Sequence, residues 1–202
     1  MPPIADKQTL DVYSEEAAKY ATRDRKERAD GFLDPFIAMM PPGAVVLDLG
    51  CGAGWAGGLM QDCGFDVHGL DATPEMAALA QAKLRNKVRI ASFESVDEIA
   101  AYDGIWASGA LLHVAKAEMP ALLARFTRAL KPGGLLLATF KSGTGEARDQ
   151  IGRFYAYYDL DELRELFGAV SGITLEGHLE STGTDFTGNI NTVYALKARR
   201  SA

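Results

Sequence analysis

Short apolar runs that alternate with helix-like segments dominate the pattern of hydrophobic and polar positions along the chain. The run 44–49 is continuous and rich in β-branched residues, which is typical of a strand covered on both faces. Further short apolar runs follow at intervals, and the residues between them repeat at helical spacing. The pattern predicts five strands, at 44–49, 66–70, 88–92, 104–107 and 135–140.

Helices are predicted before and between these strands. The clearest lies over 116–130 and has one strongly apolar face. That face is formed by Met119, Leu122, Leu123, Phe126 and Leu130. Thr73 and Pro74 suit the N-cap and first position of another helix, and Asp159 with Glu162 resembles a capping box. The other helical segments are expected at 10–40, 55–62, 96–101 and 160–168.

The strand–helix alternation predicts an α/β fold with a doubly wound, mostly parallel sheet and helices on both faces. Two more strands are expected at 173–179 and 192–198, and the turn-rich segment between them favours an antiparallel pair. We therefore expect a single domain over 1–202, with a helical region at 1–40 and a seven-stranded sheet over 41–202 whose last strand is antiparallel. Ligands of such sheets bind at the carboxyl ends of the strands.

Composition and charge exclude several classes of protein. The 202 residues are 48% hydrophobic and 24% charged, which suits one globular domain. A formal net charge of −6 argues against nucleic acid as a partner. Cys51 and Cys63 have no metal-ligand spacing, so we expect two reduced thiols and no metal. The sequence has neither a signal-peptide pattern nor a long apolar run, so we expect a soluble, cytoplasmic protein without a membrane partner.

A glycine-rich segment follows the first predicted strand. Gly50, Gly52 and Gly54 let the backbone turn tightly and approach a ligand closely. Asp71 follows about 20 residues later, at the end of the second strand, where a carboxylate can accept both hydroxyls of a ribose. Asp48, just before the loop, would oppose a pyrophosphate but suits a cation. The segment therefore predicts a positively charged cofactor that contains adenosine.

Four stretches in this order resemble the motifs of class I S-adenosylmethionine-dependent methyltransferases, namely 46–54, 69–76, 102–107 and 130–134. The resemblance covers residues from about 43 to 140. It implies a Rossmann-like fold, S-adenosyl-L-methionine as cofactor and methyl transfer to a small molecule. The segment after the fifth strand also resembles, more weakly, the bacterial methyltransferases grouped with tellurite-resistance proteins.

The resemblance further implies which residues hold the cofactor. Asp71 would hold the ribose, and Met76 and Phe93 would flank the adenine. Ser92 stands where many relatives have an aspartate, and its hydroxyl would give a weaker contact. The full implied set is Asp48, Gly50, Cys51, Gly52, Gly54, Asp71, Ala72, Met76, Ser92, Phe93, Ser108, Tyr13, Tyr20 and Arg23.

The N-terminal helical region is expected to cover the methionine end of the cofactor as a lid. Tyr13 and Tyr20 share one helical face there, and Arg23 follows them. Packing in the core is the alternative role for the two tyrosines. We predict that this lid can be removed without unfolding the sheet.

The acceptor side of the site is predicted after the fourth and fifth strands. His113 is the candidate catalytic base, because imidazole titrates near neutral pH, and a structural histidine bonded to the backbone is the alternative. The segment after 140 is expected to be a flexible loop whose bases and tyrosines suit a small anionic acceptor. A solvated loop beside a packed aromatic cluster is the alternative. The expected acceptor-binding residues are Lys141, Arg148, Arg153, Tyr155 and Tyr157.

Two other functions stay open on the sequence. A nicotinamide-dependent oxidoreductase would share the glycine loop, but Asp48 disfavours it, as does Trp55 where a dinucleotide fingerprint has its third glycine. A regulator that binds S-adenosylmethionine without turnover would have a closed pocket with no room for an acceptor. The pattern carries no signal for the oligomeric state.

Overall fold

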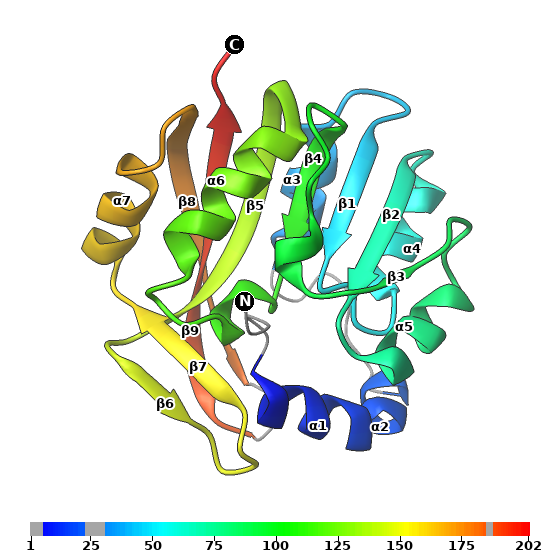
Figure 1. The fold of residues 1–202 in the computed structure, drawn as a ribbon, viewed down its shortest axis with the longest axis vertical. Coiled ribbons are helices and arrows are strands. Elements are labelled where there is room, and N and C mark those ends of the chain that lie inside the picture. The colour runs from blue at the N-terminus through cyan, green and yellow to red at the C-terminus, as the bar shows by residue number, and fades with distance from the viewer. Residues whose placement is uncertain (1–5, 23–30, 185–187) are drawn as a thin grey trace.

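The computed structural model describes residues 6–22, 31–184 and 188–202. Within them, nine strands form one sheet with the order β3-β2-β1-β4-β5-β7-β6, and β9 joins β5 to β8 (Figure 1). The strands are β1 Val45–Leu49, β2 Asp66–Asp71, β3 Arg89–Ile90, β4 Tyr102–Ala107, β5 Leu130–Ser142, β6 Glu146–Arg148, β7 Phe154–Tyr158, β8 Ile173–Thr184 and β9 Ile190–Arg200.

The predicted doubly wound, mostly parallel sheet is confirmed. Strands β1 to β5 are parallel, and the strand order reverses around β1, which pairs with β2 on one edge and with β4 on the other. β9 runs antiparallel to both β5 and β8, as the turn-rich segment before it predicted. The carboxyl ends of β1, β2 and β4 therefore meet at the reversal of strand order, where ligands bind in this kind of sheet.

Two predictions are wrong for the segment after residue 140. The described residues form nine strands instead of seven, and this segment is a hairpin instead of a flexible loop. Residues that were expected to form the loop build the hairpin β6–β7, and β7 also pairs in parallel with the carboxyl end of β5. Phe154–Tyr158 is almost wholly aromatic, and aromatic residues favour a half-buried strand over a solvated loop. The hairpin therefore extends the sheet beyond the carboxyl end of β5.

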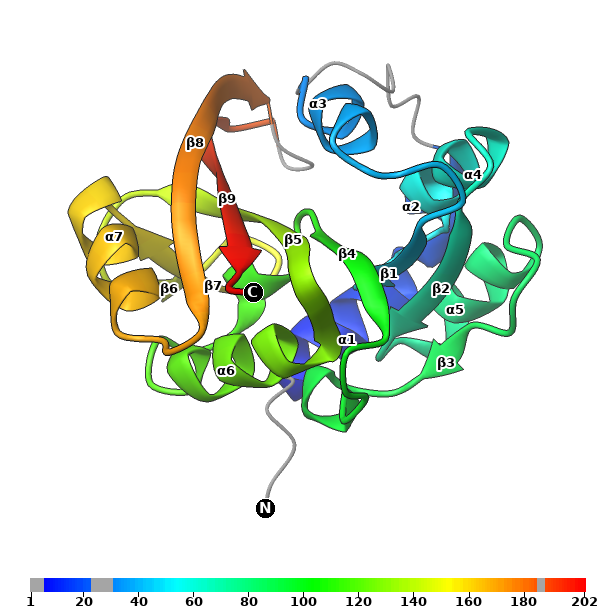
Figure 2. The same ribbon diagram turned by 90° about the horizontal axis from the view of Figure 1, so that it is seen from above.

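Helices cover both faces of the sheet (Figure 2). They are α1 Lys7–Glu15, α2 Ala17–Thr22, α3 Leu33–Ala38, α4 Trp55–Asp62, α5 Pro74–Gln81, α6 Met119–Ala129 and α7 Leu160–Gly168, with short 3₁₀ turns at η1 Phe93–Ser95 and η2 Leu111–His113. The capping box of Asp159 and Glu162 is confirmed. The helix expected at 96–101 is absent from this described stretch, where η1 comes earlier and Ala100 takes a left-handed φ of 51°.

Two apolar layers hold these helices to the sheet. One lies under α6 and α7 and includes Phe126, Phe140 and Phe167, while the other lies under α3 and α4 and includes Phe36 and Met60. α1 and α2 belong to neither layer and lie across the carboxyl ends of the central strands, at the bottom of Figure 1. These two helices are therefore placed to cover a ligand at that edge.

None of the described helices has both the length and the apolar composition of a membrane span. Cys51 is buried and Cys63 is exposed, and both are free thiols.

Candidate functional site

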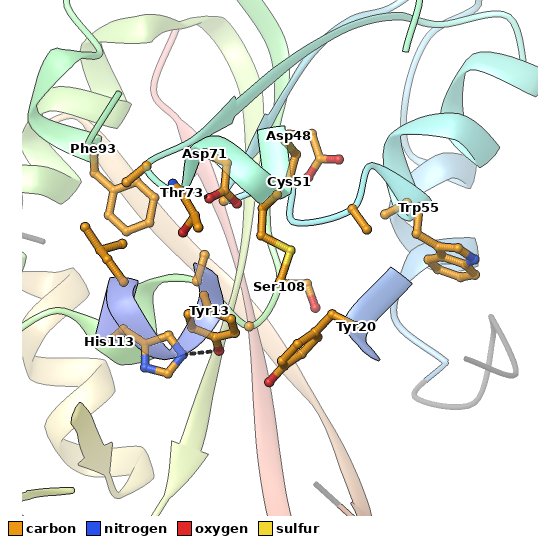
Figure 3. A pocket seen from close by; sticks show the side chains of 18 of the residues that line it. Tyr13, Tyr20, Asp48, Cys51, Trp55, Asp71, Thr73, Phe93, Ser108 and His113 are labelled. Atoms are coloured by element: carbon orange, nitrogen blue, oxygen red, sulfur yellow. Dashed lines mark hydrogen bonds between the residues drawn. The ribbon is translucent and has the colours of Figure 1, made fainter. Parts of the chain in front are cut away.

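A pocket lies at the carboxyl ends of β1, β2 and β4, between the sheet and the helices α1 and α2 (Figure 3). Its walls come from the glycine loop, the end of β2, η1 and the loop after β4. Most residues of the expected cofactor set line it: Tyr13, Tyr20, Asp48, Gly50, Cys51, Asp71, Ala72, Met76, Ser92, Phe93 and Ser108. Gly52 and Gly54 shape the loop without lining the pocket, and Arg23 lies outside the described residues.

The glycines of the loop are needed for backbone conformation and for close packing. Gly50 has a φ of 71°, and a Cβ built on it would lie 2.6 Å from the Cβ of Ala110. Gly54 has a φ of 75°, and its Cβ would lie 2.7 Å from the Cα of Ala80. A side chain at either position would push the loop away from the segment that packs on it.

The backbone N–H groups of the glycine loop are already used inside the protein. Those of Gly50 and Cys51 both donate to Leu70 O, at 2.8 and 3.0 Å. The N–H of Gly52 donates to Asp71 Oδ2 at 2.8 Å, and that of Gly54 donates to Cys51 O at 2.9 Å. A dinucleotide-binding loop directs such donors at a pyrophosphate. These four N–H groups are bonded within the protein instead, which argues against a nicotinamide cofactor.

Two carboxylates set the charge of the pocket around the glycine loop. Asp71 Oδ2 accepts from Gly52 N and its Oδ1 accepts from Thr73 N at 2.9 Å, so the carboxylate is fixed at the end of β2. Burial raises its pKa. Asp48 is only 3% exposed and also lines the pocket. A ligand here meets hydroxyl and cation acceptors, which fits a ribose and a positively charged group.

One part of the pocket is lined by apolar side chains. Phe93 lies beside Asp71 and Thr73 in Figure 3. Met76 from α5 and Leu10 from α1 line the same pocket, so three elements supply its apolar surface. Such walls suit a flat, aromatic ring.

His113 and Tyr13 form a hydrogen-bonded pair in the pocket (Figure 3). His113 Nδ1 lies 2.6 Å from Phe154 O, and its Nε2 lies 2.7 Å from Tyr13 Oη. Because the backbone carbonyl can only accept, the hydrogen belongs on Nδ1 and the Tyr13 hydroxyl donates to Nε2. His113 therefore bonds to the backbone, as the alternative interpretation predicted, and it also bonds to Tyr13.

The expectation that His113 titrates near neutral pH is wrong. Burial lowers its pKa to about 4, and the nearby cations of Arg153 and Lys141 act in the same direction. The ring packs against Tyr13 and Tyr155, with centroids 5.4 and 4.6 Å away. The sequence could not show this, because the two tyrosines and Phe154 lie far from His113 along the chain.

The depressed pKa of His113 predicts a loss of stability in acid. Between its ordinary pKa of 6.5 and the folded value of about 4, the unfolded chain binds a proton that the folded chain does not. Stability therefore falls with falling pH, by about 1.4 kcal/mol for each pH unit in this window. Urea titrations of the wild type and His113→Gln from pH 7 to 4 measure this directly. The His113→Gln variant should lose less stability between pH 7 and 4 than the wild type. Parallel pH profiles of the two proteins would contradict the lowered pKa of His113.

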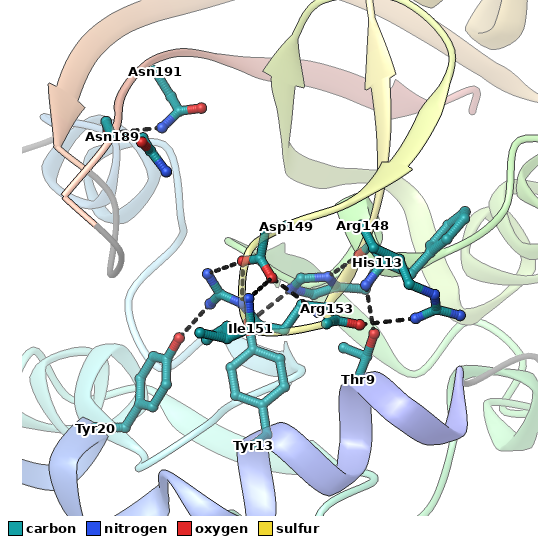
Figure 4. A network of polar contacts seen from close by, with 12 residues as sticks. Thr9, Tyr13, Tyr20, His113, Arg148, Asp149, Ile151, Arg153, Asn189 and Asn191 are labelled. Carbon is teal, nitrogen blue, oxygen red and sulfur yellow. Dashed lines mark hydrogen bonds and ion pairs between the residues drawn. The ribbon is translucent and has the colours of Figure 1, made fainter.

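The two arginines expected to bind the acceptor are paired with carboxylates of the chain (Figure 4). Arg148 donates to both oxygens of Asp6, at 2.9 and 2.8 Å, on the exposed side of the hairpin. Arg153 is 2% exposed and directs Nε and Nη2 at Asp149 Oδ2, at 2.9 and 2.7 Å. Both guanidinium groups therefore bind carboxylates of this chain, and the expected bidentate contact with the acceptor is not supported.

None of the five expected acceptor residues is among the residues that line the pocket. Tyr155 is buried behind His113, with Lys141 Nζ 4.1 Å and Arg153 Cζ 5.3 Å from its ring centroid. Tyr157 stacks on Tyr155 at 5.9 Å. The alternative of a packed aromatic cluster describes these tyrosines better, because Tyr155 and Tyr157 lie on one face of β7 and their rings contact each other.

Helix α1 is fastened to the β6–β7 hairpin by side chains of its first turns. Asp6 caps α1 and binds Arg148, and Thr9 Oγ1 accepts from Phe154 N at 2.8 Å. On α2, the Tyr20 hydroxyl accepts from Arg153 Nη1. The tyrosines of the expected lid thus face the pocket and the hairpin together.

Several pocket residues were not expected from the sequence. For the unexpected loop and strand residues, the sequence contains no pattern that indicates a ligand. Thr9 and Leu10 could have been found, because they lie on the same face of α1 as the expected Tyr13. Trp106, expected in the core, is 4% exposed and also reaches the pocket. The other unexpected residues are Asp6, Ala21, Leu33, Ala53, Trp55, Ala56, Thr73, Lys83, Gly109, Ala110 and Val114.

Comparison with known proteins shows what this chain is similar to. Residues 46–134 match the family described as "Methyltransferase domain". The chain is 31% identical over 138 residues to Phosphoethanolamine N-methyltransferase 2 of Caenorhabditis elegans, covering 62% of this chain and 31% of that relative. It is 29% identical over 167 residues to Ubiquinone biosynthesis O-methyltransferase of Xanthomonas campestris pv. campestris (strain B100), covering 73% and 69%. The chain thus spans less than a third of the first relative's length.

Solved structures share the fold. The 1,6-didemethyltoxoflavin-N1-methyltransferase of Burkholderia thailandensis, solved with 1,6-didemethyltoxoflavin and S-adenosylhomocysteine, superposes with a TM-score of 0.74 at 22% identity, covering 96% of this chain and 88% of that one. TehB from Haemophilus influenzae superposes with a TM-score of 0.69 at 19% identity, covering 94% and 67%. At these identities the likeness concerns the fold, so the narrower tellurite-resistance grouping stays a prediction.

Proposed function

We propose that this protein is a class I S-adenosylmethionine-dependent methyltransferase that transfers a methyl group from S-adenosylmethionine to a small anionic acceptor, and the match of residues 46–134 to a methyltransferase domain supports this. The glycine loop carries the proposal. Its N–H groups are engaged within the protein and its neighbours are the carboxylates Asp48 and Asp71. This chemistry suits a sulfonium, an ammonium and a ribose, and it opposes a phosphate.

The residues of the pocket fit the proposed cofactor in order. Asp71 would accept the ribose hydroxyls, and Asp48 would attract the ammonium group. Met76, Phe93 and Leu10 would enclose the adenine, with the Ser92 hydroxyl at its edge. When bound, S-adenosylmethionine supplies an electrophilic methyl group on a positively charged sulfur.

The Tyr13–His113 pair would orient the acceptor beside the cofactor. The Tyr13 hydroxyl donates a hydrogen bond to His113 Nε2, and both residues line the pocket, where they would contact the methyl acceptor. With a pKa of about 4, His113 is a weak base, and we assign it a positioning role rather than strong proton abstraction. An acceptor that is already an anion or an amine needs no stronger base.

An anionic acceptor is supported by the cations behind this pair. Lys141 and Arg153 flank the ring of Tyr155, and both are buried, whereas Asp149 is the carboxylate that pairs with Arg153. Burial is the main cause of the lowered pKa of His113, and the charges of Arg153 and Lys141 lower it further, so the same two cations would attract a negative group at the pocket. The relative from Caenorhabditis elegans is named for phosphoethanolamine, a molecule that combines a phosphate with an amine.

The helices α1 and α2 would act as the lid. They bring Leu10, Tyr13 and Tyr20 over the pocket and are fastened to the hairpin on its acceptor side. A covered pocket excludes water, and positioning with exclusion of water supplies much of the acceleration in such displacements.

A panel of matched acceptors with radiolabelled S-adenosylmethionine tests the proposal. Each pair differs by one negative charge, such as phosphoethanolamine against ethanolamine and a phenolic acid against its methyl ester. We expect turnover on anionic members, with Lys141→Met raising the KM for them and leaving affinity for S-adenosylhomocysteine unchanged. Equal turnover of both members would contradict the anionic preference. Cofactor binding without turnover of any acceptor would favour the regulator instead.

A further inference from the structure

The pocket carries an unbalanced set of charged side chains. Among the described residues that line it, the aspartates are Asp6, Asp48 and Asp71, and the single lysine is Lys83. Asp6 is neutralised by its ion pair with Arg148. The charges that face a ligand are therefore two carboxylates at the glycine loop and one ammonium.

The Lys83 side chain reaches the glycine loop from the end of α5. Its ammonium Nζ donates to Ala53 O at 2.7 Å, and Ala53 also lines the pocket. The backbone around Lys83 is fixed by Gln61, whose amide Nε2 donates to Lys83 O at 3.2 Å. Gln61 Oε1 in turn accepts from Arg85 N at 2.8 Å, and Gln61 is 5% exposed. A buried polar contact with α4 thus holds this lysine at the loop.

Leu84, the residue that follows Lys83, packs close to the Asp48 carboxylate. A Cβ built on Gly57 would lie 2.9 Å from Asp48 Oδ2 and 2.8 Å from Leu84 Cδ2. The residue next to Lys83 therefore packs against the same glycine as the Asp48 carboxylate. An ammonium and a carboxylate so placed suit a ligand group that carries both charges on one carbon.

We infer that Lys83 binds the α-carboxylate of the cofactor's methionine part and positions its amino-acid end. The inference rests on the proposed function. S-adenosylmethionine carries a sulfonium, an ammonium and a carboxylate, and the pocket offers the complementary Asp48, Asp71 and Lys83. The ammonium and carboxylate of an amino acid share one carbon, so these two groups need partners of opposite charge within one pocket, and Asp48 and Lys83 both line this pocket.

Bracing of the loop is the competing role for Lys83, because its bond to Ala53 O would stiffen the loop without any ligand. Two variants separate the roles. Lys83→Gln keeps a hydrogen-bond donor for Ala53 O but loses the charge, whereas Lys83→Met loses both. Lys87→Met is the matched control, because Lys87 is an exposed lysine of the same segment and is not among the residues that line the pocket.

The test is calorimetric titration of the full chain with S-adenosylhomocysteine and with 5′-methylthioadenosine, which lacks the amino-acid part. We expect both Lys83 variants to bind S-adenosylhomocysteine about tenfold more weakly, the size of one charge-assisted hydrogen bond. Affinity for 5′-methylthioadenosine should stay unchanged, and Lys87→Met should match the wild type for both ligands.

Three results would overturn the inference. If Lys83→Met weakens both ligands equally while Lys83→Gln behaves as wild type, the lysine only braces the loop. If neither variant changes the affinity for S-adenosylhomocysteine, Lys83 does not touch the carboxylate. If the wild type itself fails to bind S-adenosylhomocysteine, the proposed function falls and this assignment falls with it.

Discussion

Replacing Asp149 with alanine will lower the free energy of unfolding by about 3–5 kcal/mol, the usual effect of removing one partner from a buried ion pair. The side chains of Arg153 and Asp149 are 3% and 9% exposed, so water cannot replace the lost carboxylate. Asp149 also accepts from the backbone N–H groups of Ile151 and Arg153, which shape the hairpin turn. Urea denaturation followed by circular dichroism measures the change.

A matched exposed pair provides the control. Asp161 binds Arg164 at 2.7 Å, but these side chains are 85% and 57% exposed, so Asp161→Ala should change stability by less than about 0.5 kcal/mol. If Asp149→Ala were as mild as Asp161→Ala, the buried pair would not be what holds the hairpin beneath α1 and α2.

Replacing Asp71 with alanine will weaken the binding of S-adenosylhomocysteine by roughly 10- to 150-fold, since two hydrogen bonds from the ribose to a carboxylate contribute about 1.5–3 kcal/mol. Calorimetric titration gives the dissociation constants. Asp71→Asn is the companion variant, because an amide oxygen can still accept from Gly52 N or Thr73 N and so helps the loop keep its shape.

The control for Asp71 is Ser92→Ala, which changes another polar residue that lines the pocket. Ser92 would contribute at most a single neutral hydrogen bond, so its loss should weaken binding by less than about tenfold. A folded Asp71→Ala protein that binds as tightly as the wild type would contradict the assignment of Asp71 to the ribose.

The parts of the fold that could be predicted from sequence are those specified by neighbouring residues. The run 44–49, the glycine loop and Asp71 belong to one strand–turn–helix–strand unit, and its hydrophobic pattern is sufficient to predict two buried, parallel strands. The capping box at Asp159 is equally local. For such features the chain positions that interact are close in sequence, and spacing alone identifies them.

The errors concern contacts between distant parts of the chain. Arg148 was expected to bind an acceptor, but its partner Asp6 lies 142 positions away, and no spacing rule connects them. The pKa of His113 depends on burial between α1 and β7, which the sequence around His113 does not encode. Paired buried charges and shifted pKa values are properties of the assembled structure, so the acceptor side was the part that sequence described least well.

The choice of cofactor is tested most directly by titrating the wild-type protein with S-adenosylhomocysteine and, separately, with NAD in a calorimeter. The engaged N–H groups of the glycine loop and the carboxylates of Asp48 and Asp71 predict one saturable site for S-adenosylhomocysteine and no comparable heat with NAD. Saturable binding of NAD without any binding of S-adenosylhomocysteine would contradict the account.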